Sequence, residues 1–169
     1  EKYYPHSLTM SATPIPRTLA LTAYGDLDLS EIREMPFGER NVKTILISLD
    51  RIKAAYNHLK NEIDKGRQVI VICPLIEESE KLNSSSAEEV YSNLQNNIFP
   101  DYNIGLLHGR LNLNLKEEVM KKFRNANIDI LVSTTVIEVG VDIPNASVIM
   151  IQSADRFGLS QLHQLRGRV

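Results

Sequence analysis

From residue 42 to the end of the chain, two patterns of hydrophobic residues alternate. Short continuous apolar runs rich in Val and Ile are typical of strands buried on both faces of a parallel sheet. Between them, apolar residues recur every three or four positions, which is typical of helices that bury one face. The runs predict strands at residues 42–49, 68–73, 103–107, 128–133 and 148–151. The periodic stretches predict helices at residues 50–66, 87–98 and 114–123.

This alternation indicates a single three-layer α/β domain with a parallel central sheet. Asp50, Ser86 and Asn114 are the predicted N-caps of its helices, because short polar side chains accept hydrogen bonds from free helical amides. Gly66 is predicted to end the first helix. The serines at 84–86 are predicted to form a loop before the second helix.

The first forty residues have a different pattern. Residues 8–32 are predicted to contain two short strands and a short helix, interrupted by prolines that lack an amide donor. Residues 35–41 combine Pro and Gly within a polar stretch, which is typical of a linker. We therefore expect residues 1–41 to be separate from a domain at 42–169.

Composition adds a few limits to this prediction. The 169 residues, 43% hydrophobic and 24% charged, suffice for one packed core. The net charge of −2 does not by itself indicate a nucleic-acid partner. A net charge does not reveal how charges are distributed, so a local basic face balanced by acidic residues elsewhere would not be visible in it. The single cysteine, Cys73, is predicted to be a buried apolar residue, which fits a reducing, cytoplasmic setting. No segment has the length of a membrane span or the order of a signal peptide, so no membrane partner is expected.

Several polar residues directly follow a predicted strand, the place where open parallel sheets bind ligands. Thr134 and Thr135 follow the strand at 128–133, and their hydroxyl and amide groups are suited to phosphate oxygens. Gly140 would let a ligand approach the backbone, and Asp142 would accept hydrogen bonds from ribose hydroxyls. These residues make up the first group of candidates.

A second group lies elsewhere in the chain. His108 and Gly109 follow the strand at 103–107, and glycine permits close approach of a ligand or a nucleic-acid backbone. Arg166 and Arg168, spaced by a glycine, suit a phosphate held by another domain, because guanidinium is a rigid, permanently charged fork of donors.

Each candidate also has a plain structural interpretation. Thr134 and Thr135 could begin a helical turn, and Asp142 could be a turn residue before the Ile-Pro pair. His108 could be a loop histidine whose hydrogen bonds are satisfied. The two arginines could be an exposed helix end. The acidic residues at 77–80 are interpreted as a solvated face and not as a metal site.

The order and spacing of five segments resemble the motifs of superfamily 2 helicases and translocases, specifically those of the RecG branch. Residues 11–19 (SATPIPRTL) resemble motif III, and residues 75–80 (LIEESE) resemble the motif IV region. Residues 107–110 (LHGR) resemble the adjoining strand-end motif. Residues 133–144 resemble motif V, and residues 156–169 resemble motif VI without its last glycine and arginine. Motifs III and VI also resemble those of the transcription-repair coupling translocase, and residues 75–80 favour RecG.

The resemblance implies a RecA-like, P-loop NTPase-like domain, the second of two that clamp ATP and magnesium between them. The first domain of such enzymes supplies the phosphate loop and the magnesium-binding carboxylates, and the second supplies arginine fingers. Arg168 matches the first finger, which would stabilise charge on the transferred γ-phosphate. Gln164 and Arg166 would orient the loop that carries Arg168, and Gly140 and Asp142 would contact the nucleotide.

The resemblance also implies DNA as a partner, branched or forked in the full enzyme. His108, Gly109, Thr134 and Thr135 match positions near the phosphates of the tracked strand. Contacts to phosphates position nucleic acid without reading its sequence. The domain that recognises branches in this family is a separate one, so these residues say nothing about branch preference.

The resemblance further implies that this chain works with a domain that it does not contain. Ser11 and Thr13 match the motif that couples hydrolysis to domain movement, so residues 1–41 are interpreted as the tail of the first RecA-like domain and a linker. The sequence has no initiating methionine, and no G-x-x-x-x-G-K-[ST] segment occurs in it. We therefore expect a fragment of a longer enzyme, inactive as an ATPase by itself.

Two other functions stay open at this point. A non-catalytic module that binds nucleic acid or protein could have the same fold. A dinucleotide-dependent enzyme is less well supported, because the G-x-G-x-x-G segment that would follow the first strand is missing.

Overall fold

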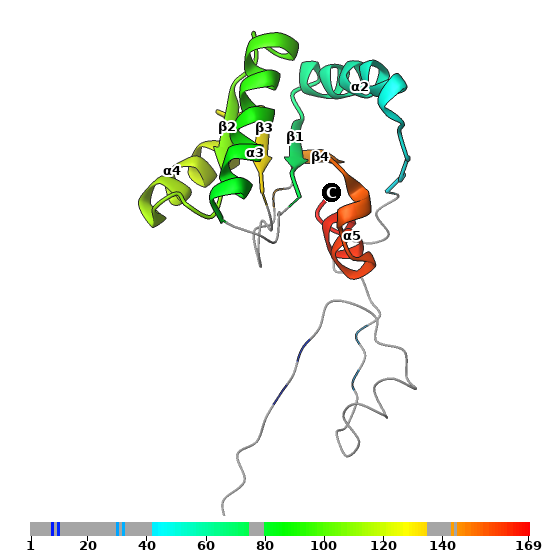
Figure 1. The fold of residues 1–169 in the computed structure, drawn as a ribbon, viewed down its shortest axis with the longest axis vertical. Coiled ribbons are helices and arrows are strands. Elements are labelled where there is room, and N and C mark those ends of the chain that lie inside the picture. The colour runs from blue at the N-terminus through cyan, green and yellow to red at the C-terminus, as the bar shows by residue number, and fades with distance from the viewer. Residues whose placement is uncertain are drawn as a thin grey trace, which may run out of the picture. The chain divides into compact units, whose positions relative to one another are not determined.

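A parallel sheet of four strands forms the centre of the domain in the computed structural model (Figure 1). The strands lie in the order β2-β3-β1-β4, and all three pairings are parallel. The parallel sheet predicted from the apolar runs is confirmed. The strands are β1 (Gln68–Ile72), β2 (Ile104–Leu107), β3 (Ile130–Ser133) and β4 (Ala146–Ile151).

The structure describes residues 42–74, 80–134, 143 and 145–169, with the backbone alone at 80–85, and four single positions before residue 42. The chain divides into two compact units, Glu1–Arg40 and Asn41–Val169. The four strands and all the helices described here belong to the second unit. The strands and helix predicted within residues 8–32 lie outside the described residues, apart from these single positions.

β1 lies inside the sheet and is paired on both sides. Val69 lies opposite Ile130 of β3 and opposite Val148 of β4. Every residue of β1 is buried, as expected for an apolar run covered by helices on both faces. Successive side chains of a strand point to opposite faces, so β1 contributes to two separate hydrophobic clusters.

Two helices cover the first face of the sheet. They are α2 (Ile52–Asp64) and α3 (Glu80–Asn93), the second continued by the π-helical segment η2 (Leu94–Ile98). Val69 and Val71 of β1 pack on this side. The buried helical residues of this cluster are Leu59, Ile63, Ala87 and Leu94.

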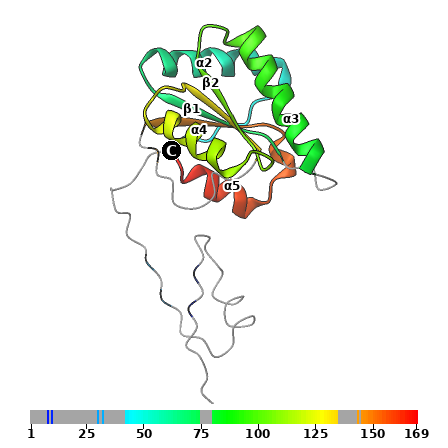
Figure 2. The ribbon, with the colours of Figure 1, turned by 90° about the vertical axis from the view of Figure 1, so that its left-hand side faces the viewer.

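Two other helices cover the second face (Figure 2). They are α4 (Leu113–Arg124) and α5 (Leu159–Arg166). Ile70 and Ile72 of β1 pack here against Phe123 of α4, which is fully buried. Partly buried residues of both helices join this cluster, among them Val119, Met120 and Leu165. Helices on both faces of a parallel sheet confirm the predicted three-layer α/β fold.

The strand predicted at residues 42–49 is wrong. Residues 42–48 form neither helix nor strand, and Leu49–Arg51 is a short 3-10 helix, η1. Ile45 and Leu46 are 61% and 94% exposed. An apolar run becomes a strand only where another strand accepts its backbone hydrogen bonds, and the pattern of side chains carries no information about that partner.

The predicted helix starts also need correction. Asp50 lies inside η1 and is not an N-cap. The serines at 84–86 continue α3, which begins at residue 80, so they form no loop and Ser86 is no cap. Asn112, and not Asn114, caps α4, because its extended backbone directs its side-chain oxygen to the amide of Leu115 at 2.9 Å.

Gly66 ends α2 as predicted. Its φ of +80° is in the left-handed region, which costs a residue with a Cβ atom about 1 kcal/mol or more. Its amide donates to the carbonyl oxygen of Ile63 at 2.7 Å. An added Cβ would have no heavy atom within 4 Å, so the glycine is needed for its backbone conformation and not for space.

Gly66→Ala is therefore expected to lower the free energy of unfolding by about 1 kcal/mol. Gly109 provides a matched control, because a Cβ there also meets no atom within 4 Å but its φ is not in the left-handed region. Gly109→Ala should change the unfolding free energy by less than about 0.5 kcal/mol. Urea denaturation of both variants measures the difference, and equal stability of the two would contradict this account of Gly66.

Glu62 of α2 is buried, with 6% of its surface exposed, and it is neutralised by two neighbours. Lys65 Nζ donates to its Oε1 at 2.8 Å, and Arg67 Nη1 donates to its Oε2 at 2.6 Å. These two hydrogen bonds lower the pKa of Glu62 from 4.5 to about 2, although burial acts in the opposite direction. The pair of cations allows a carboxylate to remain ionised at the amino end of β1.

Glu62→Gln is expected to destabilise the fold by about 1 kcal/mol at pH 7, because charge-assisted bonds are lost while both cations stay more than half exposed. A carboxyl whose pKa is lowered by folding stabilises the fold fully above its unfolded pKa of 4.5. This contribution disappears as the pH falls toward about 2. Thermal unfolding of both proteins between pH 7 and pH 2 should show the two stabilities converging, and a constant gap would argue against it.

Candidate nucleotide and nucleic-acid site

The strands end together at one edge of the sheet, and hydrogen bonds continue past each end. The amide of Thr134 donates to the carbonyl oxygen of Leu107 at 3.3 Å, which joins the ends of β3 and β2. Cys73 donates to Ser133 at 2.8 Å, and Gln152 donates to Ile72 at 2.9 Å. Residues far apart in the sequence are thus brought to one edge, where parallel sheets bind ligands.

A tight turn follows β2 and carries two of the predicted residues. The amide of Leu111 donates to the carbonyl oxygen of His108 at 3.2 Å. Lys116 Nζ of α4 donates to the carbonyl oxygen of Gly109 at 2.9 Å. A Cβ on Gly109 would extend into open space, so the domain itself does not require glycine there. The turn is held by its neighbours and leaves room beside Gly109.

The imidazole of His108 is 9% exposed and only partly satisfied. Its Nε2 lies 3.7 Å from Oε1 of Glu88 on α3, and its Nδ1 is buried with no hydrogen-bond partner among the described residues. Burial lowers the pKa of His108 below 6.5, helped by Arg110 and Lys116 and opposed by Glu88. His108 is therefore mostly neutral at pH 7, and the described residues do not satisfy both of its nitrogens.

Thr134 lies inside the domain, because only 2% of its surface is exposed. Its amide is already bonded to β2, so this amide is not free for a phosphate. It forms a bend directly after β3. Cys73, at the end of β1, is buried as predicted, and burial raises the pKa of its thiol to about 11. A thiol that stays protonated is a poor nucleophile or metal ligand.

The arginine-bearing segment follows β4. A short 3-10 helix, η3 (Ala154–Arg156), leads into α5, and the amide of Gly158 donates to Gln161 Oε1 at 3.0 Å. Leu165 and Val169 pack against the second hydrophobic cluster and hold this segment on the domain. In Figure 1, α5 lies toward the end of the sheet at which the strands finish.

The three predicted residues of this segment are placed differently from one another. Gln164 and Arg166 are exposed, and Arg166 Nη2 donates to the carbonyl oxygen of Val42 at 3.3 Å. Arg168 is half-buried just after α5, where its amide donates to the carbonyl oxygen of Leu165 at 3.1 Å. No carboxylate of the described residues forms a salt bridge with Arg168. Its charge is therefore not neutralised within the described domain.

The described candidates form two groups. His108, Gly109 and Thr134 lie at the ends of β2 and β3, whereas the residues at 164–168 follow β4, and β1 separates β3 from β4 in the sheet. The other predicted residues lie outside the described part of the chain: Thr135, Gly140, Asp142, Ser11 and Thr13.

Sequence reasoning missed two residues of this edge, Glu88 and Lys116. Both contact the turn after β2 from helices that precede and follow it. No local pattern distinguishes them from other exposed charged residues, because their roles depend on how α3 and α4 pack on the sheet. The bounds of α5 were not predicted either, although an exposed helix end at Arg166 and Arg168 was one interpretation of the sequence.

The described residues contain no group of three or more His, Cys, Asp or Glu side chains arranged to hold a metal ion. Within the same residues, no helix is both long enough and apolar enough to cross a bilayer.

The fold places this domain among the RecA-like domains of superfamily 2 helicases. A solved structure of RecG bound to a three-way DNA junction aligns with 95% of this chain and 20% of that chain, with a TM-score of 0.75 and 49% identity. Domain 2 of the DEAD-box helicase Mss116p, solved with an RNA duplex, aligns with 71% of this chain and 44% of that chain, with a TM-score of 0.52 and 26% identity.

The chain belongs to the family of the helicase conserved C-terminal domain, whose model matches residues 50–169. It is 53% identical over 163 residues to the ATP-dependent DNA helicase RecG of Thermotoga maritima, and 55% identical over 165 residues to that of Synechocystis sp.. These alignments cover 96% and 98% of this chain but only 21% and 20% of the relatives, so the chain spans about a fifth of their length. The resemblance to the RecG branch predicted from the motifs is confirmed.

Proposed function

We propose that this chain is the second motor domain of an ATP-dependent DNA helicase of the RecG type, which acts on branched or forked DNA. The observation that carries the proposal is the common edge of the sheet, where the turn after β2 and the segment after β4 present their candidate residues. Two relatives bear the name ATP-dependent DNA helicase, and a similar structure contains a three-way DNA junction. Residues 1–41 would then be the tail of the first motor domain and a linker.

In this proposal Arg168 is the finger that reaches a nucleotide held by the first domain. A half-buried arginine with no carboxylate partner among the described residues is suited to an anion supplied from outside. Leu165 and Val169 fix the position of this segment on the domain, and a fixed cation stabilises developing phosphoryl charge better than a mobile one. Gln164 and Arg166 of α5 would orient the segment that carries Arg168. Gly140 and Asp142 would contact ATP.

ATP with magnesium is the substrate in this proposal, and the first domain would bind most of it. The phosphate-loop segment does not occur in the sequence. This domain would contribute cations that the reaction needs when the two domains close. By itself, the chain would therefore not hydrolyse ATP.

The turn after β2 would contact the DNA backbone in this proposal. Gly109 is bordered by open space, and its carbonyl is held by Lys116, so the backbone is fixed while one side stays accessible. Thr134 would support this turn indirectly, because its amide joins the ends of β2 and β3. Ser11 and Thr13 would couple hydrolysis to domain movement.

Arg168→Ala in the full-length helicase should lower the DNA-stimulated ATPase kcat by on the order of a thousandfold, because loss of an arginine finger removes charge stabilisation in the transition state. Steady-state ATPase assays at saturating DNA measure it, with KM expected to change far less than kcat. Arg51→Ala, at an exposed arginine of η1, is the matched control and should leave kcat unchanged. Normal turnover in Arg168→Ala would rule out the finger.

Gly109→Ala should lower DNA affinity of the full-length helicase by about tenfold, since a Cβ would occupy the space meant for a phosphate. Fluorescence anisotropy with a forked oligonucleotide measures the Kd. Gly66→Ala, before β1 at the opposite edge of the sheet, strains the fold and should leave the Kd within about twofold. If Gly109→Ala binds DNA as tightly as the unchanged protein, the turn is not a DNA contact.

A further inference from the structure

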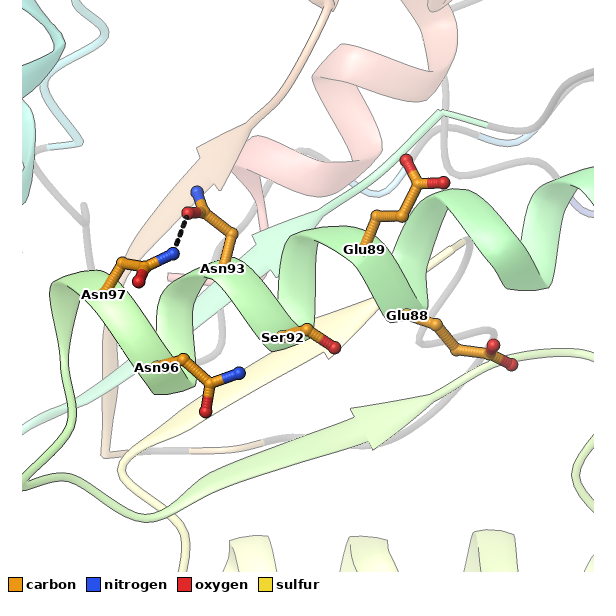
Figure 3. A pocket seen from close by; sticks show the side chains of 6 residues that line it. All are labelled: Glu88, Glu89, Ser92, Asn93, Asn96 and Asn97. Atoms are coloured by element: carbon orange, nitrogen blue, oxygen red, sulfur yellow. Dashed lines mark hydrogen bonds between the residues drawn. The ribbon is translucent and has the colours of Figure 1, made fainter.

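Glu88 on α3 lies outside all five segments that indicated the function. Its Oε1 lies 3.7 Å from Nε2 of His108, and the two side chains are 56% and 9% exposed. Glu89, the next residue, leaves α3 on a different side of the helix (Figure 3). Two adjacent glutamates on the same helix thus differ in one respect, because only Glu88 forms an ion-pair contact with the turn after β2.

This contact matters because the imidazole of His108 has few other polar partners. Nδ1 is buried without a hydrogen-bond partner among the described residues, so Glu88 is the polar group that holds the ring from the other side. A separation of 3.7 Å is longer than a hydrogen bond, and the attraction is therefore one of charges. Such an attraction is strong when the imidazole is protonated and weak when it is neutral.

Among the described residues, the charges around His108 lie on α3, on its own turn and on α4. Glu88 projects from α3 and favours the protonated ring, whereas Arg110 on the same turn and Lys116 on α4 oppose protonation, as does burial. Lys116 also binds the carbonyl oxygen of Gly109. The turn is consequently held between α4, through its backbone, and α3, through the imidazole.

We propose that Glu88 is a positioning residue for DNA binding, which holds the His108 imidazole against α3 and thereby fixes the turn that presents Gly109. The inference deepens the proposed function, because it takes the turn to be a DNA contact. Protonation of His108 strengthens the attraction to Glu88, so the turn is held more firmly at pH 6 than at pH 8. DNA should therefore bind more tightly at pH 6 than at pH 8. This difference in affinity should be smaller when the carboxylate of Glu88 is removed.

The pair itself can be tested without DNA, by an NMR titration of the histidine Cε1 protons in this chain. His108→Gln identifies the signal of His108 among the four histidines. Glu88→Gln keeps the size of the side chain and removes its charge, so the pKa of His108 should fall further below 6.5. Glu89→Gln should leave it unchanged. An unchanged pKa in Glu88→Gln would overturn the proposal.

The positioning role is tested by the Kd for forked DNA of the full-length helicase at pH 6, 7 and 8. Glu88→Gln should bind about three- to fivefold more weakly at pH 6, the range that a partly exposed ion pair supports, and the loss should shrink toward pH 8. Glu89→Gln should match the unchanged protein at each pH. A pH-independent loss would indicate a structural defect only and would overturn the proposal.

His108→Gln and Gly109→Ala, measured in parallel, separate failure of this inference from failure of the proposed function. If both weaken DNA binding while Glu88→Gln does not, the turn binds DNA and Glu88 does not position it. If none of the three has an effect, the turn is not a DNA contact, and the proposed DNA-binding role fails together with the inference. Weaker binding in all three, with a smaller pH dependence in the two variants that lack Glu88 or His108 than in Gly109→Ala, supports it.

Discussion

The double-sided pairing of β1 is the constraint on which the rest of the domain depends. β1 bonds to β3 on one side and to β4 on the other, with Val69 opposite Ile130 and Val148. Because all these strands are parallel, their carboxyl ends meet at one edge, and the turn after β2 and the segment after β4 are attached to the same rigid sheet. A strand buried on both faces cannot shift its register by one residue without moving each side chain into the wrong cluster.

The two edges of the sheet serve different purposes. At the amino end of β1, the buried side chain of Gln68 donates to the carbonyl oxygens of Phe123 and Ile128 at 2.6 and 2.7 Å and accepts from Asn145 at 3.3 Å. Both the nitrogen and the oxygen of the Gln68 amide thus have hydrogen-bond partners, which offsets the cost of burying this polar side chain. At the carboxyl end, Nδ1 of His108 has no hydrogen-bond partner among the described residues. Polar groups without partners are expected where a ligand or another domain completes the structure.

Much of the fold followed from the sequence because the apolar runs are strong local signals. The strands around residues 70, 105, 131 and 149 were located within a few residues, and Gly66 ended α2 as its flexibility suggested. The run at 42–49 failed, since a strand also needs a partner that the pattern does not name. Asn112 rather than Asn114 capped α4, because caps depend on backbone angles that two nearby asparagines could both have supplied.

The sequence by itself determined the fold class, the motif order and the identity of the arginine and glycine candidates, since residue type and spacing carry that information. Only the tertiary structure decided what surrounds them. It placed Glu88 beside His108 and Lys116 beside Gly109, buried Thr134, and held Arg168 half-buried through Leu165 and Val169. Such contacts join elements far apart in the chain, and their geometry arises only when helices pack on both faces of the sheet.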